Sequence, residues 1–443
     1  MLRKRSAAVM SAALLMSVAL AACGGNSNNN ASGNTANNAS NSAQNGSAGN
    51  TSGEVKTVKI FQFKTEIVEG LNELKVEFEK EYPNIKLDIQ TVGGGADYAA
   101  ALKTKFASGD APDIFSNGGY AEMALWQDKL EDLSDQPWVK DLIPLAAEPM
   151  TKDGKTYGMP MNLEGIGYVY NKDLFAKAGI TNTPKTISEL EEDAKKLQAI
   201  GVTPFGNAYQ EWWLLGNQGI SVAFAQQDNV NEFIDGLNAG TSTIVGNPVF
   251  KDWSNLLNLT VKYGQKNPLT TDANTHLAMF ASGETAMMQE GNWAQTLVDN
   301  ITPGMNIGMF PMPINDDAEK NDKMTVGVPA NLVVNKDSSS KEEAKTFLNW
   351  LVTSDMGKEY ITKKWKFIPA LSTIQTTPED IGALGADVDS YVKEGKVYGL
   401  QSSKFPDGVT QEFASVIQQL IAGKVDEAGW EKGMQAAWDK LKK

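Results

Sequence analysis

Residue types that build many catalytic and metal sites are scarce in this chain of 443 residues, which has one cysteine and one histidine. A single cysteine cannot form a disulfide framework, and with one histidine it cannot supply a thiolate or imidazole cluster to a metal ion. We therefore expect neither a metal nor a cofactor. Arginine occurs only as Arg3 and Arg5, so the rest of the chain lacks the bidentate group that recognises phosphate and carboxylate. Together with a formal net charge of −14, this argues against nucleic-acid binding.

Long apolar runs are also scarce, and the one at the N-terminus indicates export. After a basic start at Leu2-Arg3-Lys4-Arg5, residues 7–22 form an apolar run of sixteen residues. This is shorter than the roughly 20 residues that a bilayer span needs. The run ends in Leu20-Ala21-Ala22-Cys23, which resembles the bacterial lipobox. We expect a lipoprotein signal peptide over residues 1–22, a lipid on Cys23, and a location on the extracytoplasmic face of the cell membrane. An ordinary signal peptide with a chance cysteine is the alternative.

The next segment has the composition of a tether. Residues 23–53 contain mostly Asn, Ser, Gly, Ala and Thr, with no aromatic or charged side chain. Such a segment cannot bury enough apolar surface to offset its conformational entropy, so it is expected to be disordered. Thirty flexible residues span roughly 30 Å.

The remaining body alternates strand and helix patterns. Strands are expected near residues 58–61, 85–89 and 113–115, with helices over 68–82 and 98–106 between them. This βαβαβ order predicts an α/β fold with a parallel sheet covered on both faces. A further strand is expected at 166–170. Capping boxes are expected at Thr186–Glu189 and at Ser340–Glu343. At about 390 residues, two α/β lobes are more plausible than one core.

Four stretches of the body, in the same order, resemble one protein family. They are Gly109–Phe115, Asp153–Pro160 with Tyr170–Phe175, Phe280–Met288 with Gly291-Asn292-Trp293, and Lys341–Leu351 before Thr353-Ser354. Together they are similar to family 1 of the extracellular solute-binding proteins, the sugar-binding lipoproteins of ABC importers that are related to maltose-binding protein. The likeness runs from about residue 55 to the C-terminus.

The resemblance implies a two-lobed, periplasmic-binding-protein-like fold of type II, with a ligand cleft between lobes joined by crossover segments. The crossings are expected near residues 162–165, 326–331 and 369–378, where Gly165, Gly167 and Gly327 could serve as hinges. The N-terminal lobe is expected over 54–163 plus 329–375, and the C-terminal lobe over 164–328 plus 376–443.

The resemblance also implies a function. The protein is expected to be a monomer without catalytic activity that captures a neutral oligosaccharide outside the membrane and delivers it to the transmembrane permease of an ABC transporter. Its contact with the membrane is expected only through the lipid anchor.

Candidate ligand contacts come from strand ends and from the family likeness. Ligands of open α/β sheets bind beyond the carboxyl ends of the strands, which selects Lys64 and Glu66 after the first strand and Asn117 and Tyr120 after the third. The resemblance adds positions whose side chains suit a sugar, because a pyranose face stacks on an indole and its hydroxyls bind carboxylates and amides. These are Glu164, Tyr209, Glu211, Trp212, Trp213, Asn292 and Trp293.

Several of these residues have a structural alternative. Lys64 and Glu66 could form a solvated turn, Glu164 could form an ion pair at the hinge, and one of Trp212 and Trp213 is expected in the core. The other tryptophans and His276 are expected to pack in the interior or at the surface. Maltodextrin binders of the family carry aromatic residues where this chain has Thr410 and Gln411, which argues against maltodextrin.

Two other classes of function stay open at this stage. A secreted glycoside hydrolase would also carry aromatics and two carboxyl groups about 5–9.5 Å apart. A binder of peptides or of an oxyanion is the second alternative, although the missing arginines count against it.

Overall fold

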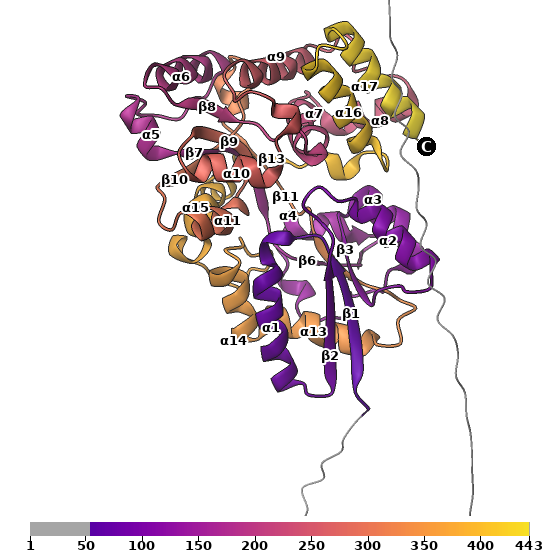
Figure 1. The fold of residues 1–443 in the computed structure, drawn as a ribbon. Coiled ribbons are helices and arrows are strands. Elements are labelled where there is room, and N and C mark those ends of the chain that lie inside the picture. The colour runs from indigo at the N-terminus through magenta and orange to yellow at the C-terminus, as the bar shows by residue number, and fades with distance from the viewer. Residues whose placement is uncertain (1–53, 443) are drawn as a thin grey trace, which may run out of the picture. The chain divides into compact units, whose positions relative to one another are not determined.

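The strands form two main sheets, each built from segments that are far apart in the sequence. The computed structural model describes residues 54–442, and Figure 1 shows their arrangement. The first sheet has the order β2 (Ile85–Thr91), β1 (Lys56–Gln62), β3 (Ile114–Asn117), β12 (Asn331–Val334), β6 (Met159–Pro160). The second has the order β13 (Val397–Gly399), β11 (Met324–Gly327), β7 (Glu164–Asn171), β9 (Thr285–Gly291), β8 (Thr203–Gly206), and β10 (Ile307–Phe310) pairs with β7.

The βαβαβ prediction is confirmed, but the first sheet is mixed rather than parallel. Strand β1 pairs in parallel with β2 and with β3, as the alternating pattern predicts. Strand β12 then joins antiparallel to β3 and to β6. The difference arises because β12 returns from a point more than 200 residues further along the chain, a pairing that no local pattern encodes. A separate hairpin, β4 (Thr151–Lys152) and β5 (Lys155–Thr156), turns at Asp153-Gly154, where both residues have positive φ.

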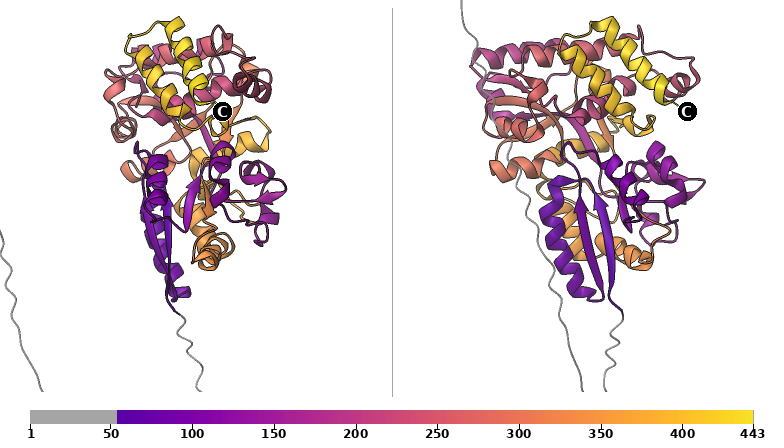
Figure 2. Two further views of the ribbon diagram at one scale, coloured as in Figure 1. Left: turned by 90° about the vertical axis from the view of Figure 1, so that its right-hand side faces the viewer. Right: turned by 45° about the vertical axis from the view of Figure 1, so that its right-hand side comes forward.

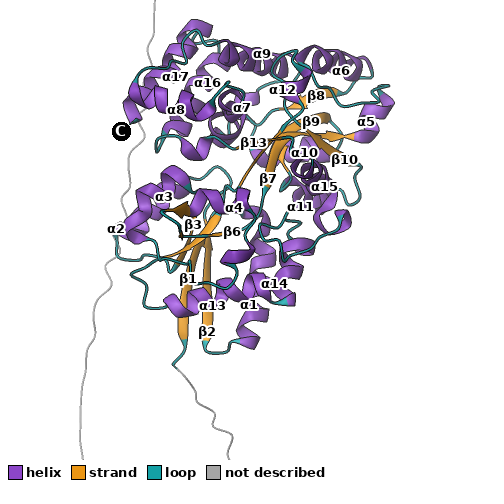
Figure 3. Cartoon of the chain, turned by 180° about the vertical axis from the view of Figure 1, so that it is seen from behind, coloured by secondary structure: helices purple, strands orange, loops and turns teal. Residues whose placement is uncertain are grey.

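Helices surround both sheets, as Figure 3 shows in purple around the orange strands. In the N-terminal half of the chain they are α1 (Val68–Glu81), α2 (Tyr98–Ala107), α3 (Tyr120–Trp126), α4 (Pro144–Ala147), α5 (Lys172–Lys177), α6 (Ile187–Ala199) and α7 (Ile220–Ala225). Those that follow are α8 (Val230–Ala239), α9 (Pro248–Lys262), α10 (Ala273–Ala281), α11 (Ala294–Ile301), α12 (Ala318–Asn321), α13 (Lys341–Thr353), α14 (Asp355–Glu359), α15 (Pro378–Lys393), α16 (Val409–Ile421) and α17 (Glu427–Leu441).

Short 3₁₀ and π turns complete the elements. The 3₁₀ turns are η1 (Thr65–Ile67), η2 (Gln127–Lys129), η3 (Val139–Asp141), η4 (Glu148–Met150), η6 (Pro268–Thr270) and η8 (Ser402–Lys404), and the π turns are η5 (Trp213–Gly219) and η7 (Tyr360–Lys364). None of the helices described over residues 54–442 combines the length and the apolar character that a bilayer span requires.

Local sequence signals account for where several helices begin. Helix α6 starts with a complete capping box, in which the Thr186 side chain accepts from the Glu189 amide and the Glu189 side chain accepts from the Thr186 amide. The box expected at Ser340 is wrong. The Ser340 hydroxyl donates to the carbonyl of Thr57 at 3.1 Å, so it links α13 to β1 instead of capping its own helix.

The chain passes between the two sheets at neighbouring points. Strand β6 leads within four residues into β7, and β11 leads into β12 over the same distance. These connections lie side by side, since Gly327 pairs with Glu164 on one side and Asn331 pairs with Pro160 on the other. A third connection links the segment after η7 to α15, which packs against β7, β10 and β11.

The three glycines near these connections are required by close packing. A Cβ atom on Gly165 would collide with the Val388 side chain of α15, and one on Gly167 would collide with the Phe310 carbonyl oxygen. On Gly327 it would stand 2.6 Å from Leu400 Cβ. Their role as hinges stays a prediction, but space alone already demands glycine at each position.

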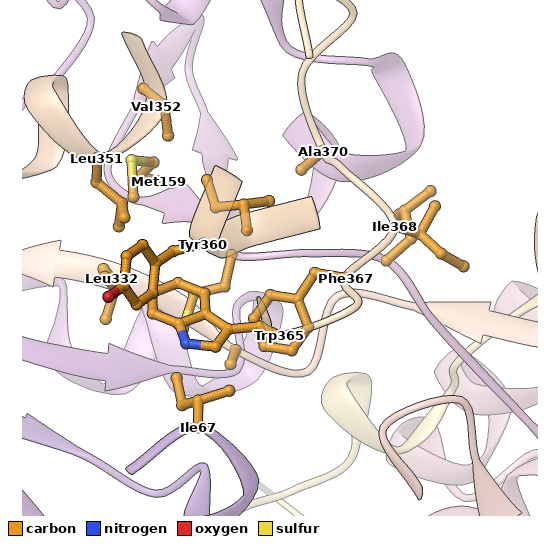
Figure 4. Packing of buried hydrophobic residues seen from close by; sticks show 14 of the residues in the cluster. Ile67, Met159, Leu332, Leu351, Val352, Tyr360, Trp365, Phe367, Ile368 and Ala370 are labelled. Atoms are coloured by element: carbon orange, nitrogen blue, oxygen red, sulfur yellow. The ribbon is translucent and has the colours of Figure 1, made fainter. Parts of the chain in front are cut away.

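Aromatic and aliphatic side chains fill the interior beside the first sheet. Figures 1 and 2 show α1 running along β1 and β2. Trp365 is 3 % exposed and packs between Tyr360 and Phe367, with ring centroids 6.0 and 5.6 Å away. Figure 4 shows this cluster, with Leu332 of β12 beside Tyr360. Six of the tryptophans expected to pack are buried, namely Trp138, Trp350 and Trp365 in this cluster and Trp253, Trp430 and Trp438 in the cluster beside the second sheet, while Trp126 is half-buried.

Candidate functional site

A buried ion triad joins the segment after β1 to the start of β7. The Lys64 ammonium group contacts a carboxylate oxygen of Glu164 and lies 2.7 Å from Glu66 Oε1. Lys64 is 4 % exposed and Glu164 is 5 % exposed. Burial by itself would lower the pKa of Lys64, but the two carboxylates outweigh it and raise that pKa above its usual range. The predicted residues Lys64, Glu66 and Glu164 are therefore brought together, at the point where the two sheets are connected.

This arrangement bears on the alternatives left open by the sequence. Lys64 and Glu66 do not form a solvated turn, because their side chains are only 3 % and 9 % exposed. Glu164 does form an ion pair near the connecting strands. Removing one partner of such a pair would leave an uncompensated buried charge, which costs about 3–5 kcal/mol of stability. Each member of the triad is thus required by the other two in the fold, independently of any contact with a ligand.

Two asparagines near the strand ends keep free amide donors. Asn117 ends β3 and is fully buried; its Oδ1 accepts from the Gly119 amide at 2.8 Å. Asn292 follows β9 and is 1 % exposed; its Oδ1 accepts from the Gly165 amide at 2.9 Å. Within residues 54–442, neither Nδ2 group finds a hydrogen-bond acceptor. Because a buried unpaired donor is costly, each of these amides is suited to an acceptor from outside the protein.

Two indoles and a carboxylate form the aromatic part of the site. Trp213 donates from Nε1 to Glu211 Oε2 at 3.2 Å, and its ring meets that of Trp293 edge to face at 6.4 Å. Glu211 is 6 % exposed and also accepts from the Ala273 amide at 3.1 Å. The Trp293 ring lies over Gly291, where a Cβ atom would collide with it. A glycine two positions before Trp293 therefore fixes where the indole lies.

The structure separates Trp212 from Trp213. Both are half-buried at the start of the helical segment η5. Trp212 packs against the hydrophobic cluster beneath the second sheet, whereas Trp213 contacts Glu211 and Trp293. Consecutive residues of a helix point about 100° apart, so they face different surroundings.

Tyr209 lies in the interior, whereas Tyr120 lies half-buried at the start of α3. Tyr209 is 2 % exposed within the hydrophobic cluster, and its hydroxyl group is paired with Thr260 Oγ1 at 2.6 Å. Its polar atom is therefore already used inside the fold. Tyr120 begins α3 with a φ of 43°, a strained value for a residue with a side chain, and the Lys404 ammonium group lies 5.2 Å from its ring centroid.

Glu290, which the sequence analysis did not single out, belongs to the same group. It is 5 % exposed near the end of β9, and its Oε2 has no hydrogen-bond partner among the described residues. Burial raises its pKa to about 8, with further repulsion from Glu66 and Glu211. His276 Nε2 lies 3.7 Å from Glu290 Oε1, and burial lowers the pKa of this histidine to about 4. The one signal in the sequence was its position just before Gly291-Asn292-Trp293.

Further contacts join segments next to the first sheet with segments next to the second sheet. A Cβ atom on Gly95, in the loop after β2, would lie 2.7 Å from Glu211 Oε2. Lys103 of α2 pairs with Asp407, which precedes α16, at 2.7 Å. These contacts bring the segments that follow β2 against segments associated with the second sheet. Residues 54–442 bring no three His, Cys, Asp or Glu side chains together in a way that could hold a metal ion.

Comparisons with known proteins identify the relatives of this chain. The family described as bacterial extracellular solute-binding protein matches residues 64–358. The multiple sugar-binding protein of Streptococcus mutans is 26% identical over 327 residues, which cover 71% of this chain and 75% of that protein. The melibiose/raffinose/stachyose-binding protein of Bacillus subtilis is 25% identical over 306 residues, covering 65% of this chain and 67% of that protein.

Solved structures show the same fold. A solute-binding protein in complex with raffinose has a TM-score of 0.75 at 23% identity and covers 87% of this chain and all of its own. A Bacillus licheniformis sugar transporter protein in complex with stachyose has a TM-score of 0.73 at 23% identity, with the same coverage. At this identity the likeness establishes the two-lobed type II fold, and the family match extends over two thirds of the sequence. The chain belongs to the family of bacterial extracellular solute-binding proteins.

Proposed function

We propose that this protein is the substrate-binding component of an ABC transporter, which captures a neutral oligosaccharide outside the membrane and delivers it to the permease. The observation that carries the proposal is the chemistry of the site. Two indole rings stand beside the Glu211 carboxylate, and the adjacent Asn292 has an unpaired amide donor, which matches the apolar faces and the hydroxyl groups of a sugar. One relative, which is named for melibiose, raffinose and stachyose, supports the choice of ligand class.

Within the site we assign the ligand contacts to Trp213, Trp293, Asn117, Asn292 and Glu211. Lys64, Glu66 and Glu164 form the polar base of the site, where the two sheets connect. Tyr120 stays a candidate contact, and Trp212 is assigned to the packing of the hydrophobic cluster. Tyr209 is left out, because its hydroxyl group is bound to Thr260. No step of bond cleavage is assigned to any residue, in keeping with the binding proteins among the relatives.

The proposed lobes are residues 54–163 plus 329–375 and residues 164–328 plus 376–443. The strands support these boundaries, because each sheet takes its strands from one of the two sets. Asn117, Asn292, Lys64 and Glu211 are all at least nine-tenths buried. A sugar can therefore reach them only if the lobes first separate, which is the reason to propose a hinge at the connecting strands.

A thermal-shift screen tests the proposed function. Raffinose, stachyose, maltotriose, xylotriose and N-acetylchitotriose are added separately, since a ligand that binds the folded state raises the melting temperature by mass action. At least one should raise it in a concentration-dependent way and be recovered intact. If every sugar leaves the melting temperature unchanged, the proposal is wrong; if a bound sugar is cleaved, the protein is a hydrolase.

We also propose that Cys23 carries a lipid anchor and that the body is held at the outer face of the membrane. Cys23 and the tether over 23–53 lie outside the described residues, so the support is the motif Leu20-Ala21-Ala22-Cys23 alone. Two acyl chains are enough for stable membrane attachment. After cell fractionation the wild type should partition with the membrane and Cys23→Ser should not. Equal membrane fractions for the two would contradict the anchor.

A further inference from the structure

The proposed site holds more negative than positive charge. Four glutamates, Glu66, Glu164, Glu211 and Glu290, contribute carboxyl groups that are 9 % exposed or less. Among the described residues, Lys64 is the one lysine that pairs with any of them, and it already contacts both Glu66 and Glu164. No arginine occurs after residue 5. Even with a proton on Glu290, the four carboxyl groups and Lys64 leave two uncompensated negative charges.

Two of the carboxyl groups are not neutralised by any cation. Glu211 accepts only neutral donors, namely Trp213 Nε1 and the Ala273 amide. Glu290 has one oxygen without any hydrogen-bond partner within residues 54–442. Both stand next to Trp293, since Trp213 links Glu211 to its ring and the Trp293 side chain interacts with the Glu290 carboxyl group. The uncompensated charge of Glu211 therefore lies where the proposed ligand binds, and the Lys64–Glu66–Glu164 triad carries the other one.

We propose that this site selects sugars by charge: it binds neutral oligosaccharides, accepts an amino group in place of a hydroxyl group, and rejects a carboxylate, with Glu211 as a specificity-determining residue. This inference rests on the proposed function and adds to it the charge class of the ligand. Like charges brought together at a binding site cost several kcal/mol, and specificity often comes from such repulsion. The free amides of Asn117 and Asn292 could each donate to a carboxylate, but they carry no net charge to offset the glutamates.

A ligand amino group, which is positively charged at pH 7, is attracted by the carboxylates that repel a ligand carboxylate. The unpaired oxygen of Glu290 accepts a hydrogen bond from either a hydroxyl or an ammonium group, and the ammonium adds attraction to Glu66 and Glu211. A ligand amine can therefore occupy the site without a cost in unpaired charge.

Isosteric ligands separate charge from shape. The parent sugars are raffinose, maltotriose and N-acetylchitotriose. Calorimetry at pH 7 compares the affinity for each sugar with the affinity for its derivative in which a terminal CH₂OH is oxidised to a carboxylate. The primary amide of that acid, which has the same shape and no charge, is the reference, and the derivative with a terminal CH₂NH₂ is the cationic probe. We expect the amide and the amine to bind within about tenfold of the parent sugar, and the carboxylate at least about thirtyfold more weakly than the amide.

A matched pair of variants then assigns the residue. In Glu211→Gln the ratio of amide to carboxylate affinity should fall at least about threefold. The same substitution at the exposed Glu284, at the other end of β9, should leave the ratio unchanged. Equal binding of amide and carboxylate by the wild type overturns the inference while leaving the proposed function intact, because the neutral sugar still binds. If none of these three sugars binds and the thermal-shift screen finds no other, it is the proposed function that fails; a sugar that only the screen finds replaces them as the parent of the same derivatives.

Discussion

At the scale of single residues, burial decides what the side chains of the proposed site can do. Glu164 and Lys64 form an ion pair with each other, and the Tyr209 hydroxyl group forms a hydrogen bond with Thr260. Asn292 keeps an unpaired donor and Trp293 keeps a half-buried ring. The residues that remain chemically free are therefore fewer than the residue types alone suggest.

Trp293 is expected to provide stacking energy for a sugar. Stacking on an indole contributes about 1–3 kcal/mol by analogy with base–aromatic stacking, so Trp293→Ala should weaken sugar binding about tenfold or more. Trp293→Phe retains an aromatic face and should recover part of that loss. Calorimetry on the sugar found in the screen measures both. Wild-type affinity in Trp293→Ala would place this indole in the packing of the lobe rather than in the binding site.

Glu290 is expected to make stability fall as pH rises. Its pKa is raised to about 8 by burial, against an ordinary value of 4.5, so between these values the folded state holds a proton that the unfolded state has released. The free energy of unfolding should then decrease with pH, by about 1.4 kcal/mol per unit. This penalty is absent below pH 4.5 and complete above pH 8.

Urea denaturation at pH 5 and pH 7 tests this slope. Relative to the wild type, Glu290→Gln should gain about 2 kcal/mol between the two pH values, because glutamine cannot titrate. The exposed Glu284→Gln serves as the control and should show no such gain. His276 contributes a slope of opposite sign between about pH 4 and 6.5, but it is present in all three proteins. Parallel pH profiles for the wild type and Glu290→Gln would contradict the raised pKa.

At the scale of elements, we expect the contact between β7 and α15 to lose stability when a larger side chain is introduced at Gly165. A methyl group on Gly165 would collide with Val388, so Gly165→Ala should reduce the free energy of unfolding by roughly 1–3 kcal/mol. In Gly165→Ala/Val388→Ala the second change removes the colliding atoms, and the double variant should be more stable than the two single changes predict. Chemical denaturation of all four proteins measures this coupling. If the two changes in the free energy of unfolding are additive, a methyl group at Gly165 does not collide with Val388.

At the scale of the whole molecule, ligand binding is expected to favour the closed arrangement of the lobes. Asn117 and Trp293 come from different lobes of the proposed division, so a sugar that touches both binds the closed state better than the open one. Contacts such as Lys103–Asp407 then belong to the closed state.

Small-angle scattering of residues 54–443 measures the closure directly. The radius of gyration should decrease on saturation with the bound sugar, and Trp293→Ala at the same sugar concentration should show a smaller decrease. An unchanged radius, with binding verified by calorimetry, would indicate a rigid preformed site.

The sequence by itself determined the elements and the class of the protein. The apolar periodicity of α1 and the alternation of β2 are local patterns, and they place both elements within a residue or two of where the structure has them. The four family stretches identified the two-lobed fold. The family likeness also selected Glu211, Asn292 and Trp293. The structure links Glu211 to Trp293 through Trp213, and Asn292 directly precedes Trp293 in the chain.

Only the tertiary structure decided the partners of those residues. The Lys64–Glu164 pair spans a hundred positions, and the hydroxyl partner of Tyr209 comes from α9, so no local pattern could reveal either. The same holds for Glu290, because its altered pKa arises from burial and from carboxylates on other segments. Residue type is a local property, but pairing, burial and charge balance depend on segments that meet only when the chain has folded.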